Sequence, residues 1–575
     1  MGAALEAAGF PAADPAFERP KQADHGDWAT TVALRLAKPA KRPPRDIAQA
    51  LVDHLELPDA VERAEIAGPG FVNFRLAHRY HEDLIHRVLE AGIAFARREL
   101  PADQRETVNV EFVSANPTGP LHVGAGRWAA TGDAIAELLE AAGHAVVREY
   151  YVNDAGEQIR RFGESVVLVH RGQELTEDHY RGSYIAEIAR DLVEAHGEQL
   201  FDPAHVTGDE VHLDDTGDDV DDTAAAGDDA SPLVEPFVAA RVGVLAVEAM
   251  RARIQGQLHH LGVDFDVWFS ERSLHDGGAI SATVAQLTND GRTYEQDGAT
   301  FLRTTEFGDD KDRVLVRSDG RPTYFAADCA YLRDKWSRVT EAAGEGSAGG
   351  RLIYLLGADH HGYVARLKAA AVCLAIPEDR VEIRIGQLVN LLRDGEPVRM
   401  SKRAGELVTL DEVVDEVGVD VTRYHFLRQS LDTTVDFDLA VVAQRSMDNP
   451  VYYAQYAHAR INSLIRTADE RGFDHGTLAD ADLARLTHPA ELELLTELAK
   501  LPLVVAEAAE LRATQRLARY AEDLAATFHR FYAECRVLVE GDDDLGRARY
   551  WLAVAAKQVL ADALGLLRVD APERM

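Results

Sequence analysis

The chain has 575 residues, 46% of them hydrophobic, which indicates a globular protein of roughly three or four domains. No segment is apolar over enough residues to cross a membrane, and no basic residue precedes Arg19 to begin a signal peptide, so we expect a cytoplasmic protein. Its three cysteines stand far apart without a CxxC motif, so the sequence indicates neither a disulfide framework nor a cysteine zinc site.

The formal net charge of −36 runs against the basic surface expected of a nucleic-acid-binding protein. Arginine supplies nearly all the positive charge, because only nine lysines occur among the 61 basic residues. Many carboxylates with few lysines are typical of proteins that work in concentrated salt, where screening removes the self-repulsion of the surface. We therefore predict a halophilic source.

The first 104 residues predict a small α+β domain. Its expected elements are a segment from Glu18 to Leu36, a basic stretch at 38–45, a helix at 47–55 and a turn at 68–74.

A strand, a turn and a helix follow one another from Thr107 onward. Apolar residues alternate at 108–112, as in a strand, and then recur at helical spacing from Gly124 until Gly143 ends the helix. A second strand is predicted at 145–151.

A glycine-bearing loop between a strand and a helix N-terminus predicts an anion site near Gly124, and the anion is expected to belong to a nucleotide. Gly124 and Gly126 also fit the loose dinucleotide fingerprint. That alternative stays open, although ten residues separate the glycines from the strand.

Residues from about 160 to 300 predict a mostly helical insertion. It is interrupted at 207–231 by a run of Asp, Gly, Ala and Thr that is too poor in large apolar groups to pack, so we expect a disordered acidic loop there. A binding tail is the alternative. Strands are expected to return at 300–304, 314–317 and 351–356.

Asp359 and His360 follow the last of these strands, which is continuously apolar. Ligands of parallel α/β sheets bind at the carboxyl ends of the strands, so both residues are expected to face the site. His360 and His361 could instead bind a metal, but the sequence offers no third ligand at a useful spacing.

A strand at 381–385 is followed by Arg399-Met400-Ser401-Lys402-Arg403, and the chain then becomes helical. Residues 437–575 predict a helix bundle, with helices beginning near Asn449 and at 492–511, 517–531 and 551–567.

These motifs together resemble the arginyl-tRNA synthetase family of class I. Pro120-Leu121-His122-Val123-Gly124 is similar to the first ATP signature of class I synthetases, and 111–124 with 151–156 is similar to the longer arginyl pattern. Met400-Ser401-Lys402 resembles the second signature. Two positions depart from the family: Ala125 replaces the usual His, and Arg399 replaces the usual lysine.

The resemblance implies an N-terminal tRNA-contacting domain at 1–104, a Rossmann-type catalytic domain at 105–436 and a helical anticodon-binding domain at 437–575. It implies arginine activation by ATP with Mg²⁺, followed by transfer to tRNA(Arg), in a monomer without a protein-bound metal site. His122 and Lys402 would be catalytic. The implied ATP-binding residues are Gly119, Pro120, Leu121, His122, Val123, Gly124, Asp359, His360, Met400, Ser401 and Lys402.

By residue match, the arginine-binding residues would be Glu111, Ser114, Asn116, Asp154, Tyr324 and Asp328. The implied tRNA contacts are Asn73, Phe74, Tyr452, Tyr453, Tyr456 and Met575. The aromatic residues among them could equally pack in a core, and Asp328 could be a carboxylate at a helix N-terminus. Two alternatives remain. The first is a different class I synthetase, and the second is a tRNA-binding relative without catalysis, which only Ala125 supports.

Overall fold

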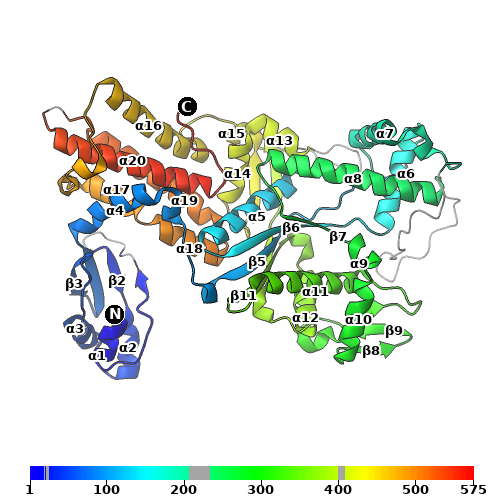
Figure 1. Ribbon diagram of the computed structural model, residues 1–575, viewed down its shortest axis with the longest axis horizontal. Helices are drawn as coiled ribbons and strands as arrows, with labels where there is room; N and C mark the ends of the chain where they lie inside the picture. The colour runs from blue at the N-terminus through cyan, green and yellow to red at the C-terminus, as the bar shows by residue number, and fades with distance from the viewer. Residues whose placement is uncertain (19, 21–24, 206–232, 399–407, 540) are drawn as a thin grey trace.

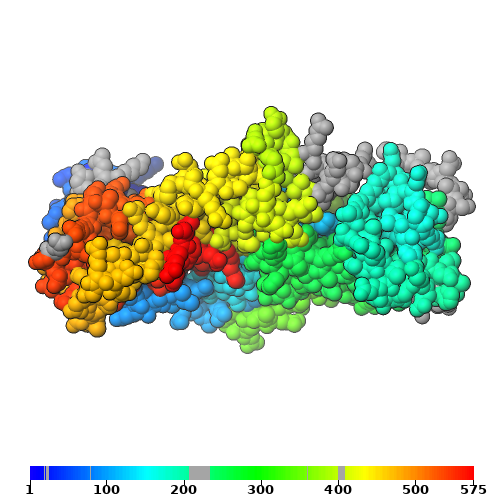
Figure 2. Space-filling view, turned by 90° about the horizontal axis from the view of Figure 1, so that it is seen from above, coloured from blue at the N-terminus to red at the C-terminus, as the bar shows by residue number. Residues whose placement is uncertain are grey.

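The structure is a computed structural model that describes residues 1–18, 20, 25–205, 233–398, 408–539 and 541–575. The expected acidic loop at 207–231 lies outside the described residues. The described chain is elongated, with the helices of 157–260 at one end and the helices of 450–565 at the other (Figures 1 and 2). Among the described helices, none combines the length and apolarity that a membrane span requires.

The N-terminal unit is a four-stranded antiparallel sheet covered by helices. The strand order is β1 (Phe17–Glu18), β2 (Trp28–Thr30), β4 (Phe71–Leu76) and β3 (Val61–Ala67), and the helices are α1 (Gly2–Ala7), α2 (Val32–Ala40) and α3 (Pro44–Asp53). Helix α3 matches the helix predicted at 47–55. The turn predicted at 68–74 is the tip of the β3–β4 hairpin, and most of it is strand.

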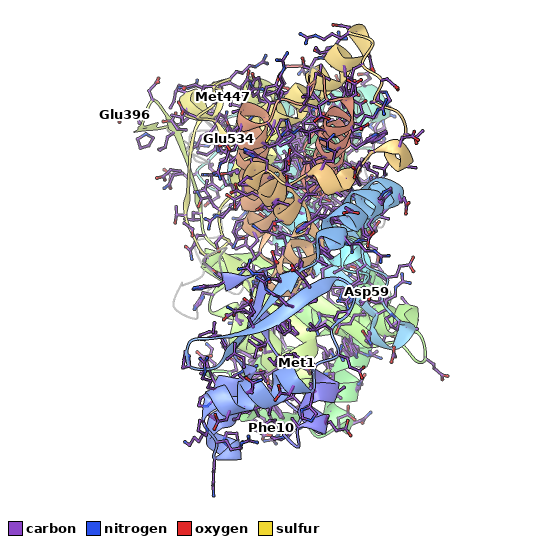
Figure 3. All side chains as sticks on the ribbon, turned by 90° about the vertical axis from the view of Figure 1, so that its left-hand side faces the viewer. Met1, Phe10, Asp59, Glu396, Met447 and Glu534 are labelled. Carbon is purple, nitrogen blue, oxygen red and sulfur yellow. The ribbon has the colours of Figure 1, made fainter. Side chains whose placement is uncertain are left out.

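The chain leaves this unit earlier than the expected boundary at 104. Helix α4 (His78–Ala91) packs on the C-terminal bundle, where its residues Leu84, Ile85 and Val88 are buried. The N-terminal sheet and its helices have a separate core. Figure 3 shows this unit, with Met1 and Phe10, set apart from the bundle that carries Glu534.

A five-stranded parallel sheet forms the centre of the molecule. Its order is β12 (Val381–Gly386), β11 (Gly349–Gly357), β5 (Glu106–Glu111), β6 (Ala145–Val152) and β7 (Val267–Ser270). Helix α5 (Val123–Ala141) covers one face, and α11 (Tyr324–Ala343) with α12 (Tyr363–Cys373) covers the other (Figure 1). The carboxyl ends of β5, β6 and β11 therefore meet at one edge.

The range expected to be a helical insertion needs a correction, because it contains β7, an edge strand of the central sheet. The inserted helices are α6 (Glu157–His170), α7 (Ser183–His196) and α8 (Pro236–His260). After β7 come α9 (Arg272–Asp276), α10 (Ala279–Asn289) and a small antiparallel sheet of β8 (Thr293–Gln296), β9 (Ala299–Leu302) and β10 (Arg313–Val316).

The segment around 399–407 is flanked by described elements on both sides. Before it lie β13 (Val389–Arg393) and β14 (Glu396–Pro397), and after it lie α13 (Leu410–Val417), α14 (Val419–Leu427), β15 (Val435–Asp438) and the short α15 (Leu439–Val442). Strand β15 pairs in parallel with β13, so the two ends of this region are held together.

The C-terminal bundle consists of α16 (Pro450–Glu470), α17 (Pro489–Leu498), α18 (Leu501–Leu511), α19 (Thr514–Glu534) and α20 (Asp543–Gly565). The prediction of a single helix at 492–511 is wrong. The chain turns at Ala499 and Lys500, and Pro502 lies in the first turn of α18. The last residues lie along α16, where Nδ1 of His458 bonds the carbonyl of Pro572 at 2.9 Å (Figure 2).

Buried charges join α5 to the later part of the chain. Arg423 is fully buried, and its guanidinium donates to Asp133 at 2.6 Å and to the Leu567 carbonyl at 3.2 Å. Arg568 and Arg148 both donate to Glu137 on the same helix. Removing one partner would leave a buried charge uncompensated, so these contacts hold α5 against α14 and the end of the bundle, and Arg148 holds it on β6.

Candidate functional site

The loop after β5 begins with strained backbone. Val113 and Ser114 have φ angles of 68° and 40°, a region that a β-branched residue such as valine rarely enters. The turn brings the Ser114 hydroxyl back to the end of its own strand, where it donates to Glu111 at 3.1 Å and accepts the Tyr151 N–H at 3.1 Å. Strain of this kind persists where the surrounding structure holds it, and it often marks a functional site.

His122 is the N-cap of α5. Its Nδ1 accepts the N–H of Gly124 at 3.0 Å, and a neutral ring that accepts at Nδ1 carries its proton on Nε2, which can donate to an anion. A Cβ on Gly124 would lie 2.8 Å from the His122 ring, so glycine is required for this approach. His122 also pairs with Thr409 in an isolated antiparallel bridge. The residues that follow the 399–407 segment therefore lie beside the loop.

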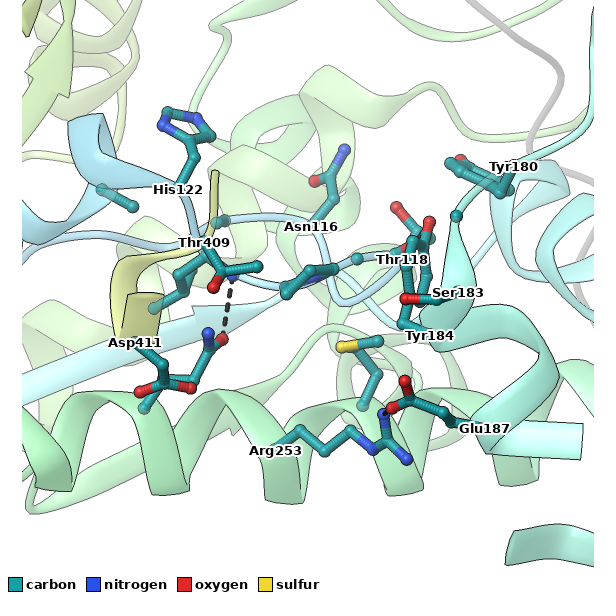
Figure 4. Close-up of a pocket in the computed structure, with 18 of the residues that line it drawn as sticks. Asn116, Thr118, His122, Tyr180, Ser183, Tyr184, Glu187, Arg253, Thr409 and Asp411 are labelled. Carbon is teal, nitrogen blue, oxygen red and sulfur yellow. Dashed lines mark hydrogen bonds and ion pairs between the residues drawn. The ribbon is translucent and has the colours of Figure 1, made fainter. Parts of the chain in front are cut away.

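A cavity of about 1090 Å³ opens between this loop, α7, α8 and the start of α13 (Figure 4). The Tyr184 hydroxyl of α7 donates to the Thr118 carbonyl at 3.0 Å, and the Leu121 N–H donates to Gln257 of α8 at 2.9 Å. The inserted helices therefore hydrogen-bond to the loop. Predicted site residues that line the cavity are Asn116, Gly119, Pro120, Leu121 and His122.

Two of the predicted arginine-binding residues, Glu111 and Asp328, belong to a group of four acidic residues. We call this group the acidic cluster and define it as Glu111, Glu149, Glu271 and Asp328. The sheet register places Tyr354, Glu111 and Glu149 side by side on β11, β5 and β6. Glu111, Glu149 and Glu271 are at most 7% exposed. Adjacent buried carboxylates repel one another, so they require cations or hydrogen-bond donors from neighbouring elements.

Helix α11 supplies those groups. The Tyr331 hydroxyl lies 2.7 Å from Glu149 Oε1 and 3.0 Å from Glu111 Oε2, so the two carboxylates share its single proton, and the Lys335 ammonium pairs with Glu111. Arg338 donates to both oxygens of Glu149, at 2.7 and 2.9 Å. Burial by itself favours the neutral carboxyl, but Lys335 and Arg338 outweigh it and hold the pKa of Glu149 at about 2.

Asp328 lies in the second turn of α11 and behaves differently. Burial raises the pKa of its carboxyl to about 7, helped by the negative charges of Glu271 and Glu111, while the Tyr363 hydroxyl and Arg366 oppose the rise. The helix is capped by the Thr323 side chain, so Asp328 is not the N-terminal cap that the alternative reading required. A carboxyl with a pKa near 7 ionises readily when a cationic ligand binds beside it.

Two further candidates have other surroundings. The Asp154 carboxylate accepts the Ser270 hydroxyl at 2.6 Å and the Arg272 N–H at 3.0 Å, so it ties the end of β6 to the end of β7. Tyr324 is half-buried at the first position of α11, one turn before Asp328.

Three predicted ATP contacts, Met400, Ser401 and Lys402, lie outside the described residues. Asp359 and His360 form a short 3₁₀ turn directly after β11, at the carboxyl edge of the sheet as expected, and His360 is exposed. In the described part of the chain, no group of three or more His, Cys, Asp or Glu side chains is placed to hold a metal ion.

The expected nucleic-acid contacts divide into buried and accessible ones. Asn73 and Phe74 are each 7% exposed in β4, and the Phe74 ring belongs to the N-terminal core, which favours the core alternative for both. On α16 the rings of Tyr452 and Tyr456 are half-buried and stacked, with centroids 6.3 Å apart, and Tyr453 packs on the bundle core. Met575 is 51% exposed.

Comparisons with known proteins match the three parts of the fold: the N-terminal unit, the domain of the central sheet and the C-terminal bundle. Family profiles match the "Arginyl tRNA synthetase N terminal domain" at 2–76, the "tRNA synthetases class I (R), catalytic domain" at 89–195 and 246–465, and the "DALR anticodon binding domain" at 454–575. The arginine–tRNA ligase of Frankia alni is 47% identical over 562 residues, which cover 97% of this chain and 94% of that protein.

The chain belongs to the arginyl-tRNA synthetase family. Its activity is the ATP-dependent ligation of arginine to tRNA. A proposed arginyl-tRNA synthetase from Campylobacter jejuni is 33% identical, with a TM-score of 0.73 over 87% of this chain and 100% of that one. The arginyl-tRNA synthetase of Thermus thermophilus has the same fold, with a TM-score of 0.74 at 24% identity over 100% of this chain and 98% of that one.

Around Glu111 and Asp328 the structure gathers further candidate site residues that the motifs missed: Glu149, Tyr151, Glu271, Tyr331, Lys335 and Tyr363. Tyr331 and Lys335 follow Asp328 by three and seven residues, so helical spacing alone would have placed all three on one face of α11. Glu271 and Tyr363 carry no comparable signal. Ala125, at the position where the first signature usually has His, is 6% exposed, belongs to the core of the catalytic domain and borders the cavity.

Proposed function

We propose that the acidic cluster and Tyr324 bind the substrate arginine. The observation that supports this most directly is Asp328, whose carboxyl has a pKa of about 7 among three other carboxyl groups. A guanidinium is costly to desolvate unless it meets carboxylates, and a pocket with excess acid compensates that cost. Arginine binding would in turn stabilise the ionised form of Asp328.

In this proposal the two ends of arginine meet different residues. Tyr324 and Asp328 take the guanidinium side, while Glu111, Ser114 and Asn116 hold the α-amino and carboxylate end. Asp154 supports the wall of the pocket through Ser270 and Arg272 rather than touching the substrate.

ATP would lie along the loop from Gly119 to Gly124, with Asp359, His360 and Met400 to Lys402 around it. The arginine carboxylate would attack the α-phosphorus, so that a mixed anhydride with AMP forms while the bond from the α-phosphorus to the α,β-bridging oxygen breaks and pyrophosphate leaves. Mg²⁺ would come as the ATP complex, held mainly by phosphate oxygens and water. His122 and Lys402 would stabilise the charge that develops on the phosphates.

In the second step the terminal ribose hydroxyl of tRNA(Arg) attacks the activated carbonyl, and AMP leaves. Neither step requires a protein nucleophile, so positioning and charge stabilisation account for the catalysis. Tyr452 and Tyr456 present stacked rings to which unpaired anticodon bases could add. The N-terminal unit would contact tRNA through its exposed surface rather than through Asn73 and Phe74.

We further propose a cytoplasmic monomer from a halophilic source. Both sides of the site come from one chain, since His122 meets Thr409 and Glu111 meets Lys335. The net charge of −36 supports the halophilic part, and the place of protein synthesis supports the cytoplasm.

The test is aminoacylation of a total tRNA pool by the purified chain, with ATP and each amino acid in turn. Arginine alone should be attached. Attachment of another amino acid at a similar kcat/KM would contradict the assignment of the acidic cluster as a guanidinium site.

A further inference from the structure

Among the described lysines, Lys335 is the one that pairs with the acidic cluster, through Glu111, and it is 0% exposed. It stands on the face of α11 that carries Asp328 and Tyr331. Its Nζ pairs with Oε2 of Glu111 and lies 4.4 and 4.1 Å from the ring centroids of Tyr331 and Tyr354. A carboxylate on one side and two aromatic rings on the others form a closed cage around the ammonium.

Such a placement is costly in the absence of compensation, because an ammonium loses its hydration when it is fully buried. The compensation comes from Glu111 and Glu149, which the sheet register sets side by side. Arginine is the usual cation of this chain and is used next to it, as Arg338 on Glu149. A lysine here indicates that a compact point charge is required where a planar fork would not fit between the rings.

The bonds of Glu111 show what this charge does. Oε2 accepts the Lys335 ammonium and shares the single proton of the Tyr331 hydroxyl with Glu149. Oε1 accepts the Ser114 hydroxyl at 3.1 Å. Among the described residues Oε1 has no second donor, so it keeps an accepting position beside Ser114.

We propose that Lys335 is a positioning residue for the α-ammonium group of arginine: it fixes the Glu111 carboxylate so that Oε1 is presented to the substrate. This inference rests on the proposed arginine site. Lys335 does not touch the substrate in this arrangement. It acts through Glu111, and it also keeps Glu111 and Glu149 from repelling each other when the site is empty.

The test compares Lys335→Met with the wild type in arginine-dependent aminoacylation. The variant should raise the arginine KM about tenfold or more, the loss expected for a charge-assisted contact, with kcat and ATP KM changed less than about threefold. Arg338→Met is the matched control, because it removes the neighbouring cation of α11 from Glu149 and leaves Glu111 bonded. Its arginine KM should change less than about threefold.

Two further measurements separate positioning from a general structural role. The inhibitor 5-guanidinopentanoate, which is arginine without its α-amino group, should bind the Met variant and the wild type equally, because it makes no contact with Glu111. In the Glu111→Gln background, Lys335→Met should add little to the arginine KM, since residues that act through one contact are not additive.

An unchanged arginine KM in Lys335→Met, equal weakening of 5-guanidinopentanoate, or additive effects with Glu111→Gln would each overturn the proposal. If Lys335→Met does not fold, Tyr331→Phe removes the hydroxyl that Glu111 Oε2 shares with Glu149, with almost no change of volume. It should raise the arginine KM about threefold and leave the inhibitor unaffected. If arginine use survives Asp328→Ala unchanged, the arginine site itself is wrong; if only the Lys335 variants behave like wild type, the positioning role alone is wrong.

Discussion

The carboxyl of Asp328 should make arginine binding depend on pH near neutrality. Its pKa of about 7 in the substrate-free protein means that half of the molecules carry a neutral carboxyl at pH 7. A guanidinium binds the ionised form, so the apparent arginine affinity falls by the fraction ionised. The arginine KM should therefore decrease about tenfold between pH 6 and pH 8, while the ATP KM should not follow this profile.

Asp328→Asn tests the reasoning, because it keeps the shape of the side chain and removes the titration. The loss of a charge-assisted pair is expected to cost about 2–4 kcal/mol of arginine binding, roughly thirtyfold to a thousandfold in KM. The arginine KM of the variant should be nearly flat between pH 6 and pH 8. Steady-state aminoacylation with saturating tRNA and ATP over this pH range measures both quantities.

The same substitution has a stability readout that does not need activity. The folded pKa of Asp328 lies above the unfolded value of about 3.9, so between those values the folded state binds more protons than the unfolded state. Its contribution to stability is therefore present at low pH and is lost as the pH rises through 7. Asp328→Asn should raise the melting temperature several times more at pH 8 than at pH 4.5.

A wild-type arginine KM that is constant from pH 6 to pH 8, together with equal melting shifts of the variant at both pH values, would refute this account of Asp328. In that case the carboxyl is already ionised by a cation, and the site does not select arginine in this way.

Lys402→Ala should lower kcat for adenylate formation about a hundredfold with little change in ATP KM, because its contact would tighten as charge develops on the leaving pyrophosphate. Pre-steady-state pyrophosphate release measures this rate. A wild-type rate in the variant would assign the role to another group. Tyr456→Ala should raise the tRNA KM about tenfold and leave the arginine KM unchanged, because base stacking is worth about 1–3 kcal/mol; equal tRNA KM values would assign the ring to packing alone. Raising KCl from ~0.1 M to ~1 M shortens the Debye length from about 10 Å to about 3 Å, so the melting temperature and the aminoacylation rate should both increase; a steady decrease of both would remove the halophilic proposal.

Local pattern was sufficient for the elements that depend on neighbours in the chain. Alternation at 108–112 and helical spacing after Gly124 predicted β5 and α5, and the loop between them was expected to hold an anion. Gly124 and the capping His122 lie two residues apart, so their contact follows from local geometry. The family resemblance came from the same short motifs.

Local pattern was not sufficient where packing between distant segments decided the outcome. Helix α4 was expected in the N-terminal domain, but its apolar face is buried on α20. An apolar helix face predicts that the helix is buried on one side, but not which element it packs against. The break at Lys500 was missed although Pro502 is a local signal for a helix start, because α17 and α18 are both apolar and helical in pattern; both helices pack on α19.

The proposed arginine site shows the same division between local pattern and packing. Glu111, Ser114 and Asp328 were named from motifs, but the sequence determined neither their protonation nor their partners. Those depend on the register of β5 with β6 and β11 and on the face that α11 turns to the sheet, which bring together residues more than 200 positions apart. Charge and burial act through space, so only the tertiary structure could decide that Lys335 neutralises Glu111 while Asp328 keeps its proton near neutrality.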